Sequence, residues 1–566
     1  MTDPAAPSHE TETTNHVGGA VALLTALLLW RVCAIMISPL DLGPDEAQYW
    51  RWGQSFDWGY YSKPPLIAWV IGSVTGIFGD SAWAVRLPAP FLHTLVAALI
   101  FAAARRMQDT RTGVYAVLIY ILMPGVTFSS GLMTTDSILF VFWALALWLL
   151  WRMRSGDKSW QIALGLGLAI GAGFLAKYAM IYFCLGLALT LIIDKPTRSA
   201  FGLRNGALAL LGALFVLAPH IGWNIANDLQ TVSHTADNAN WSGELFHPEH
   251  AVKFLVDQMG VFGPVSFLTL LTGIALTCKR GTEADTADKT GRWLICFVLP
   301  ALLVILVQAV TSRAHANWAA TAYVAGSILV ARWMASERTL PAWLWYSTGL
   351  ALVFAAAFVP DLTLLARVGL GLGLAALVLA FGKANHWRIS GLLWGGLGLH
   401  LITALVFTAL AAGPLDWANQ AGLANAFKRT RGWVQTTQQA SDLVAQHGAS
   451  AIVVDERENW HGLDFYGRET LGVPVYAWPR YASPKSYADQ HQLGIGAPGP
   501  VLIASVREDF RPRIRADFEK LEAIGYLDIP LGGNTKRAFK LYLGYGYKPL
   551  ARTPEWTARF EGQIEK

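Results

Sequence analysis

Stretches of apolar residues long enough to cross a membrane recur along most of this chain, from about residue 17 to about residue 412. A membrane-spanning helix needs about 20 mainly apolar residues. Only 15% of the residues are charged, against about 25% in ordinary soluble domains. A soluble core does not explain this density of apolar stretches, so the sequence predicts a helical protein that crosses a membrane many times.

Windows of about 17 to 25 apolar residues predict about thirteen spans. The predicted spans are 17–38, 83–104, 112–129, 136–152, 160–176, 178–194, 203–221, 252–277, 293–311, 317–334, 341–359, 361–381 and 389–412.

The loops between these spans differ in basic charge from one side of the membrane to the other. Alternate loops carry clusters such as Arg105-Arg106, Arg152 with Arg154, and Lys279-Arg280, whereas the intervening loops carry few Lys or Arg residues. Short loops rich in Lys and Arg stay in the cytoplasm. We therefore expect residues 1–16 to form a cytoplasmic tail and residues 39–82 to form the first loop on the outer side.

Residues 413–566 differ in character from the membrane domain, 17–412. Short β-like runs at 451–454, 473–476, 501–504 and 539–542 alternate with polar segments that favour helix at 425–447 and 511–525. This pattern predicts a small soluble α/β domain, which an odd number of spans places on the outer side.

Charge and cysteine content exclude some functions. The net charge of +5 is modest and the basic residues are scattered, so the chain is not expected to bind nucleic acid. The four cysteines fall in or beside apolar stretches without paired spacing. They indicate neither a metal site nor a set of disulfides.

Chemically active residues gather in the loops of the predicted outer side. Basic groups there can neutralise a phosphate, carboxylates can accept a proton or bind a cation, and aromatic rings offer flat surfaces to sugars. The residues are Asp45, Glu46, Tyr49, Trp50, Tyr61, Lys63, Asp136, Lys177, Trp241, Arg313, His315 and Asn317. This combination favours a lipid-linked phosphosugar as ligand, although each residue alone also fits helix capping, an aromatic belt or a snorkelling side chain.

The order of these motifs resembles a known family. Arg31 is followed by Pro44-Asp45-Glu46-Ala47, by Tyr60-Tyr61-Ser62-Lys63-Pro64-Pro65 and by Arg86-Leu87-Pro88, and the order continues through Thr134-Thr135-Asp136 and Ala176-Lys177-Tyr178. The chain resembles the bacterial protein mannosyltransferase-like family, which includes the lipid A aminoarabinose transferases and related GT-C polyprenyl-phosphate-sugar glycosyltransferases. The resemblance is strongest over about the first 200 residues.

The resemblance implies a polytopic helical membrane fold of GT-C type, with interfacial helices near 44–56 and 64–79 and an outer soluble domain. It implies an inverting hexosyl- or pentosyltransferase of the family 39/83 kind, in a bacterial inner membrane with its active site on the periplasmic side. The donor would be a polyprenyl-phosphate-linked sugar, and the acceptor lipid A, lipopolysaccharide core, another glycan or a protein.

The resemblance implies roles for Asp45, Glu46, Asp136, Lys63 and Lys177, and the chemistry of the outer face suggests the roles of the other residues. Asp45, Asp136 and Glu46 are the expected catalytic residues, with Asp45 the first choice for base. The residues expected to bind the carrier phosphate are Lys63, Lys177, Arg31 and Arg313. Those expected to bind sugar or other substrate groups are Tyr49, Trp50, Tyr61, Trp241, His315 and Asn317.

Three questions stay open at this level. No cofactor is certain, although a divalent cation at Asp45 and Asp136 is an alternative that the sequence leaves open. A transporter or flippase of lipid-linked sugars, or a non-catalytic envelope protein that binds glycans, are rival functions. In the C-terminal domain, Tyr466 or Arg468 could fold over the cleft, or that domain could hold the acceptor.

Overall fold

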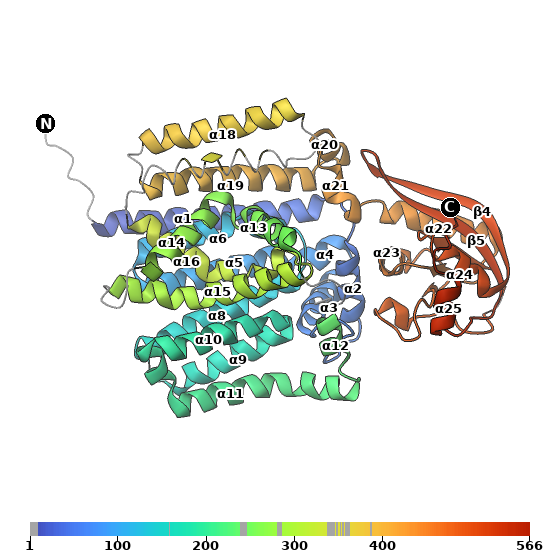
Figure 1. The fold of residues 1–566 in the computed structure, drawn as a ribbon, viewed down its shortest axis with the longest axis horizontal. Coiled ribbons are helices and arrows are strands. Elements are labelled where there is room, and N and C mark those ends of the chain that lie inside the picture. The colour runs from blue at the N-terminus through green and yellow to red at the C-terminus, as the bar shows by residue number, and fades with distance from the viewer. Residues whose placement is uncertain are drawn as a thin grey trace.

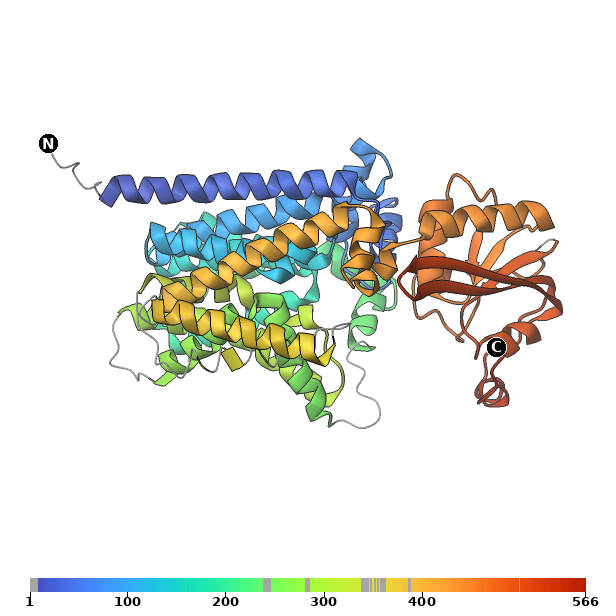
Figure 2. The ribbon, with the colours of Figure 1, turned by 90° about the horizontal axis from the view of Figure 1, so that it is seen from above.

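A long helical bundle and a smaller sheet domain lie side by side in the molecule (Figure 1). The computed structural model describes residues 9–157, 159–237, 246–279, 286–336, 346, 349–350, 353, 356, 363–384, 388–497 and 499–565. Figure 2 shows the helices of the bundle running roughly along one direction, with the sheet domain at one end. That end is called the domain-facing end below.

The bundle consists of helices joined mostly by short connections. Its described elements are α1 (His9–Ile37), α2 (Pro44–Gly53), α3 (Leu66–Phe78), α4 (Ala82–Arg86), α5 (Pro88–Met107), α6 (Thr110–Leu122), α7 (Pro124–Ser129), α8 (Thr135–Arg154), α9 (Trp160–Ala176), η1 (Tyr178–Met180), α10 (Ile181–Ile193), α11 (Lys195–Ala226), α12 (Gln230–Asp237), α13 (Pro248–Phe262), α14 (Pro264–Lys279), α15 (Thr286–Thr311), η2 (Ala316–Ala319), α16 (Ala322–Ala335), α18 (Leu364–Ala384) and α19 (Ile389–Ala412).

The apolar composition of these helices fits a membrane environment. Among the described residues, six helices are long and apolar enough to cross a membrane, and the bent pair α13–α14 would make a seventh. Six further apolar helices are shorter. The polytopic helical fold is confirmed, while the number of about thirteen spans stays a prediction, and the predicted span 341–359 falls mostly outside the described residues.

Two predicted spans are not continuous helices, because each is interrupted at a proline. The predicted span 112–129 divides into α6 and α7, since Pro124 lacks the backbone N–H that would continue the helix. The predicted span 252–277 bends by 113° between α13 and α14. There Gly263 has a φ of 87°, which glycine adopts readily, and Pro264 begins the next helix.

The first loop contains two helices, α2 and α3, close to the ranges that the resemblance implies, and their place at the membrane interface stays a prediction. α2 and α3 pack against each other, and Gly53 and Gly72 allow this close approach, since a Cβ on Gly53 would lie 2.8 Å from the Ala68 carbonyl oxygen. Figure 1 shows both helices at the domain-facing end. They lie between the bundle and the sheet domain.

The C-terminal domain is built on a five-stranded sheet of order β2-β1-β3-β5-β4. β1 pairs in parallel with β2 and β3, whereas β5 is antiparallel to β3 and β4. Its elements, with the segment that leads into it, are α20 (Leu415–Gln420), α21 (Ala424–Phe427), η3 (Lys428–Thr430), α22 (Trp433–His447), β1 (Ile452–Val454), α23 (Arg457–Gly467), β2 (Val475–Ala477), η4 (Ala488–Gln490), β3 (Val501–Ser505), α24 (Arg511–Ala516), β4 (Phe518–Gly532), β5 (Thr535–Tyr547) and α25 (Pro554–Arg559).

Both faces of the sheet carry an apolar core. One face packs under α22 and α23 around Leu502 and Leu541, and the other packs under α24 and α25 around Ile503 and Tyr542. Alternate strand residues point to opposite faces, which is why neighbouring positions in β3 serve different cores.

The predicted helix at 511–525 is wrong in its second half. α24 ends at Ala516, and β4 begins at Phe518 as the first arm of a long hairpin. The turn of this hairpin contains Gly532 and Gly533, both with positive φ. Paired glycines between two strand-forming runs are a hairpin signal.

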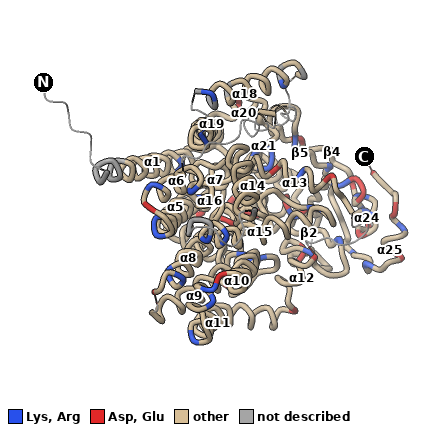
Figure 3. Tube along the Cα trace, turned by 60° about the vertical axis from the view of Figure 1, so that its left-hand side comes forward, with Lys and Arg blue, Asp and Glu red and all other residues tan. Residues whose placement is uncertain are grey.

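Charge follows the two parts of the molecule. Figure 3 shows Lys and Arg mainly near helix ends in the bundle, while both signs of charge occur around the sheet domain. Long stretches of the bundle helices carry no charge, as a membrane environment requires.

Candidate active site

Asp136 is the residue around which three segments of the domain-facing end meet. It lies in the first turn of α8 and is 7% exposed. Lys177, in the turn between α9 and η1, donates its Nζ to Asp136 Oδ1 at 2.7 Å. Asn317 of η2 donates its amide to the other carboxylate oxygen at 2.9 Å. Both oxygens of Asp136 therefore have fixed partners, and Asp136 holds the lysine and the amide in place.

Lys177 shares a cleft with Lys63. The cleft has a volume of about 300 Å³, and its lining includes Tyr182, Val304 and Ile305 beside the two lysines. Two cations at one end and an aliphatic wall along the other suit an anionic headgroup with a hydrocarbon tail. We call this space the lysine cleft.

The ionisation of Lys63 depends on this crowded setting. The pKa of Lys63 is lowered to about 8, mainly by burial and also by the charge of Lys177, while the carboxylates of Asp45 and Asp136 act in the opposite direction. Lys63 therefore lies within electrostatic range of the other three groups. A phosphate placed beside both lysines would relieve their mutual repulsion.

A second cleft borders Asp136 on its other side. It has a volume of about 750 Å³ and is lined by Asp136, His315 and Asn317 together with residues of α7, α13 and α19. We call it the aspartate cleft. The Asp136–Lys177 pair therefore joins the two clefts, because each residue lines one of them.

His315 lies at the mouth of the aspartate cleft with its ring 5.1 Å from that of Trp318. Burial lowers the pKa of His315, and the nearby Arg313 lowers it further. His315 is therefore neutral at pH 7 and has one ring nitrogen free to accept a hydrogen bond. Arg313 itself is exposed and does not line either cleft.

Asp45 lies in the first turn of α2 and is exposed to solvent. Its Oδ1 accepts a hydrogen bond from Arg457 Nη2 at 3.1 Å, and Arg457 also donates to Gln48. Arg457 begins α23, so the C-terminal domain supplies the cation that faces this carboxylate. An exposed carboxylate with one weak partner keeps lone pairs available for a substrate proton.

Glu46 is adjacent to Asp45 but is enclosed. It is 4% exposed and accepts two hydrogen bonds from Arg86, at 3.0 and 2.8 Å. It also accepts from the backbone N–H groups of Gly43 and Met133. These contacts tie α2 to the segment that enters α8, three residues before Asp136. Its predicted catalytic role stays a prediction, and its contacts give it a structural one.

Three predicted substrate-binding rings lie in packed surroundings. Tyr49 is buried against Trp52, and Trp50 is buried with its Nε1 donating to Asp80 at 2.6 Å. Tyr61 donates its hydroxyl to the carbonyl of Pro484 in the C-terminal domain. These rings do not line the two clefts, and the predicted Trp241 lies outside the described residues.

Arg31 lies apart from the two lysines with which the sequence groups it. It lines a third cavity, between α1, α7, α19 and α21, and donates to the carbonyl oxygen of Ile121 at 2.9 Å. The structure thus brings Lys63 and Lys177 together and separates Arg31 from them. The predicted role of Arg31 at the carrier phosphate stays a prediction.

The C-terminal domain docks on the first loop through α23. Tyr466 accepts a hydrogen bond from the backbone N–H of Leu42 at 2.6 Å, and Arg468 donates to the carbonyl of Asp80 at 2.6 Å. Arg51 of α2 pairs with Asp464 of α23. Tyr466 and Arg468 therefore fix the domain to the first loop without lining either cleft.

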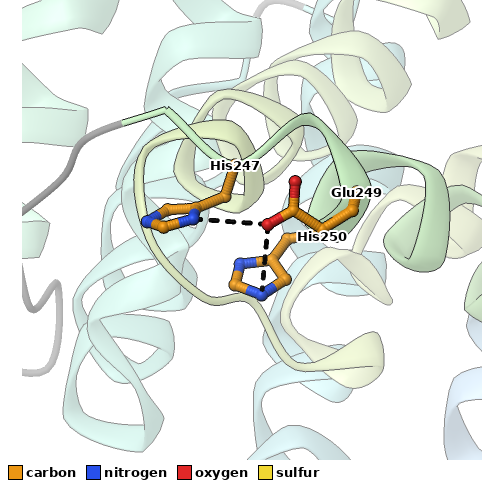
Figure 4. A group of neighbouring side chains, drawn as sticks. All are labelled: His247, Glu249 and His250. Atoms are coloured by element: carbon orange, nitrogen blue, oxygen red, sulfur yellow. Dashed lines mark ion pairs between the residues drawn. The ribbon is translucent and has the colours of Figure 1, made fainter.

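The carboxylates predicted to bind a cation have partners of another kind. Asp45 faces Arg457, and Asp136 faces Lys177 and Asn317. Within the described residues, the side chains placed close enough together to share a metal ion are His247, Glu249 and His250. Their ligand atoms lie within 4.8 Å of one another (Figure 4). In the structure, cationic and amide side chains occupy the two carboxylates. A divalent cation at Asp45 and Asp136 stays a prediction.

Comparison with known proteins provides independent information about this arrangement. Residues 62–223 match the family described as dolichyl-phosphate-mannose-protein mannosyltransferase. A lipid A galacturonosyltransferase of Rhizobium johnstonii is 38% identical over 309 residues, which cover 54% of this chain and 63% of that protein. An undecaprenyl phosphate-alpha-4-amino-4-deoxy-L-arabinose arabinosyl transferase of Pseudomonas aeruginosa is 29% identical over 251 residues, covering 41% of this chain and 43% of that protein.

The fold extends further than the sequence similarity. The structure of ArnT from Cupriavidus metallidurans in the apo state superposes with a TM-score of 0.61 at 16% identity, covering 93% of this chain and 98% of that one. A second structure of that protein, bound to undecaprenyl phosphate, gives the same values. The bundle and the sheet domain are thus both parts of a fold seen before.

Proposed function

We propose that this chain, a member of the GT-C glycosyltransferase family, transfers a sugar from a polyprenyl-phosphate carrier to a lipid acceptor at the membrane surface. The observation that carries the proposal is the cluster at the domain-facing end, where Lys63 lies within electrostatic range of Lys177, Asp45 and Asp136. Two cations and Asp136 line the two adjoining clefts, and Asp45 lies within electrostatic range of Lys63, which matches the needs of a reaction between two lipid substrates.

The lysine cleft suits the donor. Lys63 and Lys177 would face the carrier phosphate, and Tyr182, Val304 and Ile305 would line the path of the polyprenyl chain. The Cupriavidus protein of the same fold binds undecaprenyl phosphate, and the name of the Pseudomonas relative specifies an undecaprenyl-phosphate-linked sugar. These two proteins support a polyprenyl phosphate as the carrier here.

The chemistry needs one base and one positively charged leaving-group site. The acceptor hydroxyl oxygen attacks the anomeric carbon, the new C–O bond forms as the bond from that carbon to the phosphate oxygen breaks, and the configuration inverts. Asp45 takes the hydroxyl proton, because its carboxylate is exposed and weakly paired. The lysines stabilise the negative charge of the departing polyprenyl phosphate, while Asp136 positions Lys177.

The aspartate cleft suits the acceptor. It adjoins the lysine cleft through the Asp136–Lys177 pair, and His315 and Asn317 offer hydrogen-bonding groups at its edge. The Rhizobium relative is named for lipid A. Lipid A, or a lipopolysaccharide built on it, is therefore the acceptor class that we propose.

The proposed location is the bacterial inner membrane. Loops rich in Lys and Arg favour the cytoplasmic side for the opposite end of the bundle, which puts the clefts and residues 413–566 in the periplasm. The proposed domain limits are 17–412 for the membrane domain and 413–566 for the periplasmic domain, and the end of α19 at Ala412 supports the second limit.

The transporter and the glycan-binding protein are weaker alternatives. A flippase for lipid-linked sugars would place its ionisable groups near the middle of the membrane, between paired repeats. Here the charged cluster lies at one end of the bundle, and the similar proteins named above are transferases. Neither alternative uses the exposed carboxylate of Asp45 beside two lysines.

Mass spectrometry of envelope lipids tests the proposed function in cells. A deletion strain is complemented with wild type, with Asp45→Asn, with Asp136→Asn, or with Asp528→Asn, an exposed carboxylate of the hairpin paired with Lys536. We expect wild type and Asp528→Asn to restore a sugar that the deletion strain lacks, and the other two variants to fail. Restoration by Asp45→Asn and Asp136→Asn at full level would exclude the proposed mechanism.

A further inference from the structure

Arg31 is a charged residue inside a predicted membrane span. It lies six residues before the end of α1, about 9 Å along the helix at 1.5 Å per residue. Arg31 is buried, with only 3% of its surface exposed. Ionisable residues in such positions are costly and mark functional sites.

The guanidinium of Arg31 has few partners for its five N–H groups. Within the described part of the chain, its hydrogen bond is to the carbonyl oxygen of Ile121, and no carboxylate lies within ion-pair distance. Arg86 lines the same cavity as Arg31, but its guanidinium already donates to Glu46 and to the carbonyl oxygens of Leu40 and Asp41. Arg31 is therefore the cation with unused hydrogen-bonding capacity here.

The cavity beside Arg31 has the mixed lining that an anionic lipid requires. Its volume is about 80 Å³, enough for a phosphate group. Phe128, Phe407 and Phe427 supply an aromatic wall, while Thr127 contributes a buried hydroxyl that has no hydrogen-bond partner in the described structure. A buried cation and a free hydroxyl inside an aromatic wall form a site for an anion attached to an apolar group.

The same cavity adjoins the aspartate cleft. Thr127, Phe128 and Phe407 line both spaces. It does not share lining residues with the lysine cleft, which has its own two cations for the carrier. A lipid held at Arg31 therefore lies on the acceptor side of the Asp136–Lys177 pair.

We propose that the Arg31 cavity binds a phosphate group of the acceptor glycolipid, with the guanidinium and the Thr127 hydroxyl as donors and the three phenylalanines against its acyl chains. This inference rests on the proposed function, since it assigns the acceptor to the aspartate cleft. It replaces a role for Arg31 at the carrier phosphate with a role in acceptor recognition.

Direct binding tests this assignment without turnover. The full-length protein in nanodiscs is titrated with bisphosphorylated lipid A, with the same lipid A after enzymatic dephosphorylation, and with undecaprenyl phosphate. The variants are Arg31→Gln, Arg31→Lys and Thr127→Val. The control is Arg105→Gln, which replaces an exposed arginine in the last turn of α5.

We expect wild type and Arg105→Gln to bind phosphorylated lipid A at least about tenfold more tightly than the dephosphorylated form. Arg31→Gln should lose this preference, because a charge-assisted hydrogen bond contributes about tenfold or more in affinity. Arg31→Lys should keep part of it, and Thr127→Val should weaken it about fivefold. Binding of undecaprenyl phosphate should not change in any of these variants.

Three results would overturn the assignment. The first is that Arg31→Gln retains the full preference for phosphorylated lipid A. The second is that Arg31→Gln loses binding of undecaprenyl phosphate. The third is that phosphatidylglycerol competes as well as lipid A does, which would make the cavity a site for bulk lipid. Thr127→Val provides the same comparison if Arg31→Gln does not fold. Failure of wild type to bind undecaprenyl phosphate would instead count against the proposed function, and the lipid A comparison would still decide the role of Arg31.

Discussion

Lys177 donates its Nζ to Asp136 Oδ1 at 2.7 Å, and this pair is the point at which the lysine cleft and the aspartate cleft meet. Because the lysine lines one cleft and the carboxylate lines the other, a change in either residue alters the side chains offered to both. The pair thus couples the place proposed for the donor phosphate to the place proposed for the acceptor.

Asp136→Asn should lower kcat/KM by about 10²-fold. Removing one partner of a buried, hydrogen-bonded charge pair costs about 2–5 kcal/mol, and every 1.4 kcal/mol is about tenfold. Transfer rates measured on purified protein in liposomes test this. Asp528→Asn, which changes an exposed carboxylate of the hairpin, should stay within about twofold of wild type. Equal losses in the two variants would remove Asp136 from the mechanism.

The rate should fall as the pH rises through about 8. The pKa of Lys63 is lowered to about 8 by burial and by Lys177. Lys63 is therefore charged below that pH and neutral above it, so its attraction for the carrier phosphate is present at low pH and is lost as the pH rises. A pH profile of kcat/KM for the donor measures this, because that parameter reports the free enzyme.

Arg in place of Lys63 provides the matched comparison. Lys63→Arg should remove the loss above pH 8, since a guanidinium stays protonated throughout this range. Lys253→Arg, at an exposed lysine paired with Asp257, should leave the profile as in wild type. An unchanged fall above pH 8 in Lys63→Arg would assign the titration to another group.

Arg457→Gln should slow the reaction without unfolding the protein. Arg457 fixes Asp45 from the C-terminal domain, so its loss should lower kcat about tenfold through a less ordered base. The ion pair is exposed on both sides, and such pairs contribute only about 0–1 kcal/mol to stability. The measurement is kcat together with the midpoint of thermal unfolding.

The control for Arg457 lies nearby on the same domain. Arg429→Gln breaks an equally exposed pair with Glu458 that does not involve Asp45. Its kcat should equal that of wild type. If both variants lower kcat to the same degree, the effect belongs to docking of the domain in general and not to Asp45.

Glu46→Gln should destabilise the fold. Glu46 and Arg86 are both buried, and removing one charge of a buried pair costs about 3–5 kcal/mol because the other charge is left uncompensated. Thermal unfolding in detergent measures this, and the double variant Glu46→Gln with Arg86→Gln should recover part of the loss. A Glu46→Gln protein with unchanged thermal stability and no activity would instead support the catalytic role predicted from the sequence.

The sequence was sufficient for the helical membrane fold and for the presence of two helices in the first loop, because apolar length and local motif order carry that information. The breaks at Pro124 and at Gly263-Pro264 were missed because apolar content was counted through them, although proline at these positions is a local signal. The hairpin after residue 517 was missed although the Gly532-Gly533 turn was visible.

The site was only partly predictable from the sequence. Lys63, Lys177 and Asp136 could be grouped because alternation of the spans puts their loops on one side. The partner of Asp45 could not be found, because Arg457 lies 412 positions away and no local pattern joins the two. The separation of Arg31 from the lysines likewise depends on how α1 packs against α7 and α19, which apolar periodicity does not specify.

The most direct test of the central claim is transfer by the purified protein in liposomes that contain an undecaprenyl-phosphate-linked sugar and lipid A. Mass spectrometry follows both lipids, comparing wild type, Asp45→Asn, the double variant Lys63→Gln with Lys177→Gln, and Asp528→Asn. We predict that wild type and Asp528→Asn add one sugar to lipid A and release undecaprenyl phosphate in equal amount, while the other two do not. Transfer at the wild-type rate by Asp45→Asn and by the double lysine variant would contradict the account.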